Sequence, residues 1–215
     1  MLLYCLCLIT SYSLAYVFLK NKYWDIFTRI ISTLNALQCT YLFLSNLTNT
    51  KMFDLLYVAS PSSLSSLYYF SFYLLIDGVF LIPFLKPFSI QNTLSLLHHL
   101  VGSLGIYLIA SNRKGFFLGF YFSLTEISTP LLNLSWFFRH PRLLITFYLF
   151  FFIFRILTVP ILLFYLHINE SLIAQLSPLN YYMTYYGSYT LILLNVTWFV
   201  LITKKIKELR EIKRS

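Results

Sequence analysis

Long apolar runs fill most of this chain and are separated by short polar segments. They cover Leu2–Leu19, Ile26–Leu47, Leu67–Leu85, Thr93–Ala110, Phe116–Phe137, Leu143–His167 and Tyr182–Thr203. Each run is about 18 to 25 residues long, the length that an α-helix needs to cross the hydrocarbon core of a bilayer. Hydrophobicity does not alternate with period two along them, so the runs favour helices over strands. We therefore predict about seven transmembrane helices.

The composition excludes a soluble domain of ordinary kind. Of the 215 residues, 59% are hydrophobic and only 11% are charged, and the mean hydropathy is +0.73. A chain with so few polar groups cannot cover a surface that faces water. The connecting segments are too short to hold a second domain. We expect residues 1–215 to form a single multi-pass membrane domain.

Positive charge is unevenly placed along the chain. The net charge is +9, but Lys and Arg lie mostly at the ends of runs and in the segment 204–215. In a seven-helix bundle one side would carry eleven of them, namely Lys20, Lys22, Lys86, Arg139, Arg142, Lys204, Lys205, Lys207, Arg210, Lys213 and Arg214. The other side would carry three, Lys51, Arg113 and Lys114. Cytosolic loops hold the excess of Lys and Arg, so we expect a basic cytosolic tail over 204–215, a lumenal N-terminus and no nucleic-acid partner.

Six ionisable residues remain inside the apolar runs, and they point to a functional interior. They are Arg29, Asp77, His98, His99, Glu126 and Arg155. Each costs about 2.5 to 3.5 kcal/mol at bilayer depth, so such groups face one another or a polar space. The predicted fold is thus an all-α membrane bundle around an interior cavity with polar and apolar walls. The simpler alternative is a set of structural ion pairs that fixes how the helices pack.

Helical spacing places further polar residues on the same faces. Residues three or four apart form a stripe on the run Phe116–Phe137, namely Phe122, Glu126, Thr129, Asn133 and Trp136. A second stripe consists of Tyr69, Tyr73 and Asp77. Residues at these spacings share one face of a helix. We expect the side chains of Arg29, Tyr69, Tyr73, Thr129, Asn133, Trp136 and Arg155 to line the cavity or bind substrate.

Neither cysteine nor histidine spacing indicates a metal site. Cys5, Cys7 and Cys39 all fall inside apolar runs, which favours small packing residues over a disulfide framework or a zinc site. His98 and His99 are adjacent, so on a helix they point about 100° apart and cannot both bind one metal unaided. We expect no bound metal and no cofactor.

Six segments, in order, resemble motifs of the TLC-domain family, which includes translocating-chain-associating proteins and ceramide synthases. They are Trp24–Thr33, Tyr68–Gly78, His98–His99, Glu126–Trp136, Arg155–Pro160 and Asn195–Phe199. The resemblance spans about residues 20–205 and is greatest to the small TLC-domain-containing proteins. It implies a multi-pass protein of the endoplasmic reticulum membrane whose partners are membrane lipids, and it adds Asn195 to the expected cavity residues.

Two departures from the family pattern bear on catalysis. Ceramide synthases carry a His-Asp pair and a further Asp where this chain has Thr125, Glu126 and Thr129. Asn35 stands where the family usually has a histidine. Both differences remove groups that could transfer protons.

Two functions follow from the residues and the resemblance. The first is a role in lipid homeostasis, in which the cavity binds a lipid or an acyl chain without turnover. The alternative is a ceramide-synthase-like acyltransferase that uses acyl-CoA, with His98 or His99 as general base or nucleophile and Asp77 or Glu126 orienting the imidazole. A channel or transporter is disfavoured because no repeat of broken helices is evident. The sequence leaves open whether the chain assembles as a homo-oligomer.

Overall fold

The computed structural model describes residues 2–18, 21–46, 50–54, 56, 60–81 and 90–212, and its long elements are helices. The first four are α1 (Leu2–Phe18), α2 (Asn21–Asn46), α3 (Pro61–Leu81) and α4 (Ile90–Asn112). A short 3₁₀ turn, η1, occupies Thr50–Phe53. The predicted all-α fold is confirmed for these residues. Lys20, Lys86, Lys213 and Arg214 of the predicted charge count lie outside them.

The last three apolar runs each form a helix that changes its winding part-way. The fifth consists of α5 (Phe116–Thr125), the 3₁₀ turn η3 (Glu126–Ser128) and α6 (Thr129–Phe138). The sixth consists of α7 (Pro141–Phe151), the π turn η4 (Phe152–Ile156) and α8 (Val159–Ile168). A short helix, α9 (Glu170–Ile173), follows. The seventh consists of α10 (Pro178–Tyr182), the π turn η5 (Met183–Gly187) and α11 (Ser188–Ile212).

Two prolines explain two of these changes in winding. A proline lacks the N–H that would bond to the carbonyl four residues earlier, and its ring pushes that carbonyl away. Pro130 therefore frees the carbonyl of Glu126, and the Thr129 N–H bonds to it in a 3₁₀ turn. Pro160 frees the carbonyl of Ile156, and just before it the Leu157 N–H reaches back five residues to Phe152 at 2.9 Å. Both irregular turns carry a charged residue, Glu126 in one and Arg155 in the other.

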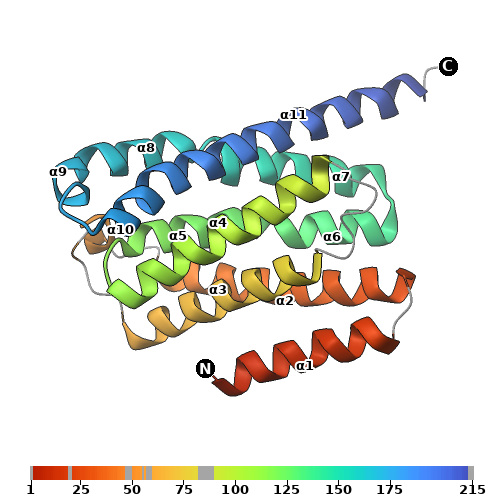
Figure 1. The fold of residues 1–215 in the computed structure, drawn as a ribbon. Helices are drawn as coiled ribbons and strands as arrows, with labels where there is room; N and C mark the ends of the chain where they lie inside the picture. Colours follow the sequence, from red (N-terminus) through yellow and green to blue (C-terminus); the bar gives the residue numbers. More distant parts are fainter. Residues whose placement is uncertain are drawn as a thin grey trace.

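The helices lie side by side in an elongated bundle (Figure 1). α1 lies at one edge and α11 at the other, and the C-terminal part of α11 extends beyond the neighbouring helices. α3 packs extensively on α4, and α2 packs on α5 and α6. α11 contacts α4, α7 and η4. Elements from both halves of the sequence therefore meet in the middle of the bundle.

Among the described residues, three helical segments are long enough and apolar enough to cross a membrane, judged by length and composition. They are Asn92–Asn112, Pro141–Ile168 and Pro178–Glu208. A shorter apolar helix covers Leu6–Tyr16. These segments support a membrane protein built from helices, and the full set of seven spans stays a prediction.

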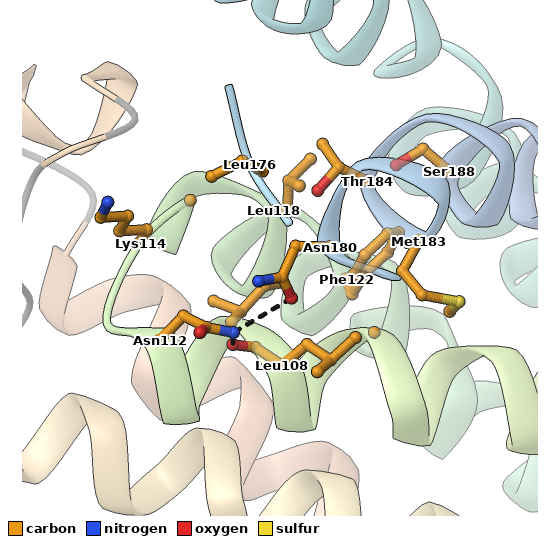
Figure 2. Close-up of a pocket in the computed structure, with 13 residues that line it drawn as sticks. Leu108, Asn112, Lys114, Leu118, Phe122, Leu176, Asn180, Met183, Thr184 and Ser188 are labelled. Carbon is orange, nitrogen blue, oxygen red and sulfur yellow. Dashed lines mark hydrogen bonds between the residues drawn. The ribbon is translucent and has the colours of Figure 1, made fainter. Parts of the chain in front are cut away.

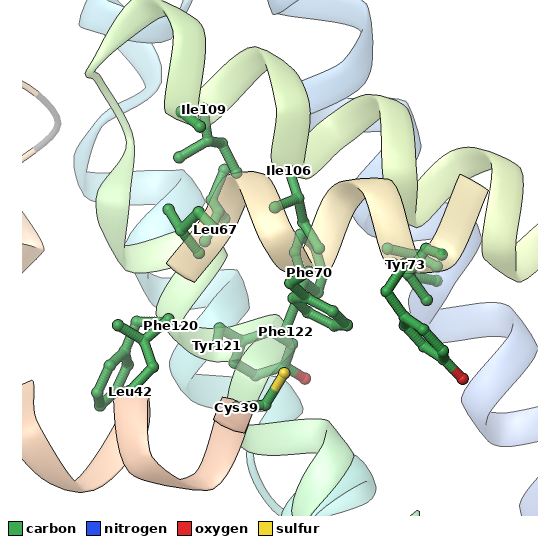
Figure 3. Packing of buried hydrophobic residues seen from close by; sticks show 14 of the residues in the cluster. Cys39, Leu42, Leu67, Phe70, Tyr73, Ile106, Ile109, Phe120, Tyr121 and Phe122 are labelled. Atoms are coloured by element: carbon green, nitrogen blue, oxygen red, sulfur yellow. The ribbon is translucent and has the colours of Figure 1, made fainter. Parts of the chain in front are cut away.

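The core lies where α2, α3, α4 and α5 meet, and it is made of aliphatic and aromatic side chains (Figure 3). Leu67 and Ile106 are fully buried in it. Gly119 brings α5 close to α3, since a Cβ at this glycine would lie 2.8 Å from both methyl carbons of Leu67. Tyr73 lies at the margin of the cluster, and in Figure 3 its hydroxyl points away from the neighbouring apolar side chains. This margin adjoins the polar residues described below.

Candidate functional site

The polar interior begins with a pair formed between α3 and α4. His99 Nε2 lies 3.4 Å from Asp77 Oδ2. The other carboxylate oxygen, Oδ1, accepts a hydrogen bond of 2.8 Å from the Tyr12 hydroxyl on α1. Tyr12 is fully buried. Asp77 is thus held between a histidine and a tyrosine, which reduces the cost of keeping a carboxylate inside an apolar bundle.

A glycine makes the approach of these two helices possible. Gly78 follows Asp77 on α3, and a Cβ built on it would lie 3.0 Å from the Cβ of His99. That distance is at the limit of what packed side chains allow, so any larger residue would push α4 away. Ser71 and Ser103 fix the register of the same two helices, because each hydroxyl donates 2.9 Å to the other's backbone carbonyl.

The second group centres on Glu126. The Arg155 Nη2 atom donates to Glu126 Oε1 at 3.3 Å, and the Thr129 hydroxyl donates to Oε2 at 2.7 Å. His98 Nε2 lies 3.9 Å from Oε1, too far for a hydrogen bond but within range of an ion pair. Glu126 and Arg155 are 8% and 6% exposed, so this is a buried charge pair.

Arg155 is anchored at every nitrogen of its guanidinium. Nε donates to the Ser128 hydroxyl at 3.1 Å, and Nη1 donates to Asn195 Oδ1 on α11 at 3.3 Å. Nη2 also lies 3.3 Å from the Thr129 hydroxyl. Because the fork of donors is rigid, these bonds fix both the position and the plane of the guanidinium. The π turn η4 is where the helix presents this side chain, and such turns often occur at functional sites.

The two histidine rings link the Asp77 pair to the residues around Glu126. Their ring centroids are 5.7 Å apart with the planes at 89°, and Trp198 of α11 lies 5.2 Å from the His98 ring. The Nδ1 atoms of His98 and His99 are both buried and have no hydrogen-bond partner among the described residues. If each Nε2–H faces its carboxylate, each Nδ1 is a free acceptor. In that tautomer both Nδ1 atoms would be able to accept a hydrogen bond from a ligand.

Tyr73 lies one turn before Asp77 on α3. It is 4% exposed, and its hydroxyl points away from the apolar cluster (Figure 3). Tyr69, one turn earlier on α3, is half-buried. The predicted α3 stripe thus contributes Asp77 and Tyr73 to the polar interior.

Arg29 contacts residues of α6. It donates to Asn133 Oδ1 at 3.1 Å, and its guanidinium carbon lies 4.3 Å from the centroid of the Trp136 ring. Asn133 Nδ2 in turn donates to the Arg29 carbonyl at 3.1 Å and to the Thr33 hydroxyl at 2.9 Å. These contacts join α2 to α6. The described hydrogen-bond and ring partners of Arg29 are therefore an amide and an indole face, and a cavity shared by Arg29 and the other ionisable residues stays a prediction.

The described pockets lie away from the histidines. One is lined by residues of α4, α5 and η5, and it contains Phe122 of the predicted stripe. The other lies where α2 ends and α3 begins, and serines and Asn46 dominate its lining. None of the predicted catalytic residues lines either pocket. The interior cavity at the histidines stays a prediction.

Three contributors were not foreseen from the sequence. Tyr12, Ser128 and Trp198 all touch a predicted site residue. Tyr12 stands in an apolar run among other aromatic residues, where nothing distinguishes it. In the described part of the chain, no group of three or more His, Cys, Asp or Glu side chains could hold a metal ion.

A family model described as the TLC domain matches residues 1–204. The chain belongs to the TLC-domain family. The matched region begins before residue 20, so it takes in α1, whose Tyr12 bonds to Asp77. Comparison with curated proteins and with solved structures found no match. TLC domains are generally found in membrane proteins of lipid metabolism, and the paired histidines, Glu126 and Arg155 of this TLC domain all fall within the matched residues.

Proposed function

We propose that this TLC-domain protein acts in lipid homeostasis by binding one lipid molecule or acyl chain at the His98–His99 face, inside the membrane. The observation that carries the proposal is the pair of buried Nδ1 atoms without a described partner. A buried acceptor left unpaired costs about 1 to 3 kcal/mol. A lipid hydroxyl or amine could donate to either nitrogen and remove that cost.

The surroundings suit an amphipathic ligand. Each histidine is backed by a carboxylate, and the Glu126 carboxylate is itself neutralised by Arg155. Polar recognition is therefore available at the two histidines, while most other residues of α4 are apolar. A headgroup donor at the histidines with hydrocarbon along the helices would satisfy both requirements. We place the protein in the endoplasmic reticulum membrane with its basic tail in the cytosol.

An acyltransferase is the second candidate, and the Tyr12–Asp77–His99 arrangement favours it. A histidine oriented by a carboxylate is the usual general base for acyl transfer. His99 Nδ1 would take the proton of a lipid hydroxyl or amine, whose oxygen or nitrogen then attacks the thioester carbonyl of acyl-CoA. The C–S bond breaks as the acyl bond forms, and the proton passes from the imidazole to the departing thiolate.

Native mass spectrometry of the purified protein tests the first proposal. We expect a lipid to remain bound to the wild-type chain and to be lost from the His98→Gln and His99→Gln variants at unchanged protein level. A wild-type protein free of lipid would contradict binding. Incubation with acyl-CoA and membrane lipid separates the two functions, since only an acyltransferase would release free CoA, and the histidine variants should then lose about a hundredfold in rate.

A further inference from the structure

Exposed cations gather at the end of the bundle where α11 extends beyond its neighbours (Figure 1). They are Lys204, Lys205 and Lys207 in the C-terminal part of α11, and Arg139 and Arg142 at the turn between α6 and α7. We call these five residues the cationic end. None of them forms an ion pair with a carboxylate among the described residues. The segment 204–215 also holds six Lys or Arg residues against two Glu, so its own acids cannot neutralise it.

The lysines of the cationic end are held in place by a contact between α11 and α7. The Phe199 ring stacks on Tyr148 with the centroids 5.1 Å apart, and the Thr203 hydroxyl donates to the Tyr148 hydroxyl at 3.4 Å. Lys207 follows Thr203 by one turn on the same face of α11. Since α7 begins at the end toward which α11 runs, Arg142 lies on the same side of this contact as the lysines (Figure 1).

Helix length sets the depth of these lysines in a bilayer. The segment Pro178–Glu208 is apolar enough to span, and Tyr182 near its start is exposed, as is typical of tyrosines at a membrane interface. At 1.5 Å per residue, Tyr182 and Lys204 are about 33 Å apart, slightly more than a hydrocarbon core of about 30 Å. With Tyr182 at one interface, Lys204 and Lys207 therefore lie among the headgroups of the other.

We propose that the cationic end binds the headgroups of anionic phospholipids in the leaflet that surrounds it. Lys and Arg near a membrane surface are attracted to anionic lipids, and they donate charged hydrogen bonds to phosphate oxygens. Nucleic acids and acidic proteins carry similar charge, but they approach from water, whereas headgroups already lie at the depth of Lys204. The inference is independent of the proposed function, which concerns the histidines inside the bundle.

Native mass spectrometry of the purified full-length protein tests this inference. Phosphatidylserine and phosphatidylcholine with identical acyl chains are added in equal amounts to the micelles, so that the two lipids differ in net charge. We expect wild type to retain at least about tenfold more phosphatidylserine, and Lys204→Gln with Lys207→Gln to lower this ratio about tenfold. A wild-type ratio near one would overturn the proposal.

The matched control removes two cations from the opposite end of the bundle. Arg113 and Lys114 are exposed at the turn between α4 and α5, and the Lys114 amine lies apart from Asn180 (Figure 2). Arg113→Asn with Lys114→Gln lowers the net charge by the same amount, and asparagine tolerates the positive φ of 55° at residue 113. This control should keep the lipid ratio within about twofold of wild type. Equal losses in the two double variants would reduce the effect to net charge and overturn the site.

A second variant separates charge from the shape of the side chain. Lys204→Arg with Lys207→Arg keeps both cations, so its lipid ratio should stay within about threefold of wild type. A loss as large as that of the glutamine pair would contradict an electrostatic site.

Two competitors separate a lipid headgroup from other anions. Neither soluble glycerophosphoserine nor a short RNA oligonucleotide should lower the ratio of bound phosphatidylserine to phosphatidylcholine more than about twofold. Displacement by glycerophosphoserine would reduce the cationic end to a site for free phosphate groups. Displacement by RNA would assign it to nucleic acid, and either result would overturn the proposal.

Discussion

Arg155 and Glu126 face each other from two irregular turns, the guanidinium on the π turn η4 and the carboxylate on the 3₁₀ turn η3, with 3.3 Å between Nη2 and Oε1. If both segments were regular α-helices, the two side chains would leave the backbone in directions other than those observed. The prolines at 130 and 160 thus help to set the geometry of the pair. Backbone irregularity and buried charge coincide at the centre of the bundle.

Arg155→Met should lower the free energy of unfolding by about 3 to 5 kcal/mol, because Glu126 would be left buried without its cation. Chemical denaturation in micelles would measure the change. The double variant Glu126→Leu with Arg155→Met is the control, and it should recover more than half of the loss since no unpaired charge remains. Equal stability of wild type and Arg155→Met would show that Glu126 is not charged in the folded protein.

His98→Gln and His99→Gln separate catalysis from packing. Glutamine keeps the size and some hydrogen bonding of histidine but removes the titratable nitrogen. If the pair is catalytic, each variant should accumulate normally and lose its lipid product by about a hundredfold. If the pair is structural, protein abundance and thermal stability should fall instead. Protein level and cellular acyl composition, measured in the same cells, distinguish the outcomes, and no change in either would exclude both roles.

Gly78→Ala should separate α3 from α4 at the site, since the new Cβ would lie 3.0 Å from the Cβ of His99. Gly105→Ala is the matched control, because its Cβ would meet only a Met183 methyl at 3.9 Å. Both substitutions gain similar helix propensity. We expect Gly78→Ala to be less stable than Gly105→Ala by at least about 1 kcal/mol. Thermal unfolding in the same micelles measures the difference, and equal stabilities would contradict the close packing.

The basic tail should be cytosolic, as the eleven-to-three division of Lys and Arg predicts. Protease added to sealed microsomes should remove an epitope placed after residue 215 and spare one placed before residue 1. Opening the microsomes with detergent should expose both, which controls for intrinsic resistance. A tail epitope protected in sealed microsomes would reverse the orientation.

The sequence alone was sufficient for the all-helical fold of the described residues and for several charged residues of the polar interior. In apolar runs long enough to span a bilayer, the backbone N–H and C=O groups must hydrogen-bond to one another, and this requirement predicts helices. Charged residues inside such runs must turn inward, which singled out Asp77, Glu126 and Arg155 in advance. Local spacing also placed Thr129 on the Glu126 stripe, where its hydroxyl bonds to that carboxylate.

Only the tertiary structure decided which of these residues meet. Spacing fixes the angle of a side chain around its own helix but not the helix that lies opposite. Packing of α3 on α4 joined His99 to Asp77, whereas packing of α2 on α6 brought Arg29 to an amide and an indole. The sequence did not indicate Tyr12 as a site residue, because its hydroxyl reaches Asp77 only when α1 packs beside α3. Contacts between distant helices depend on the shapes of whole surfaces, which no local pattern encodes.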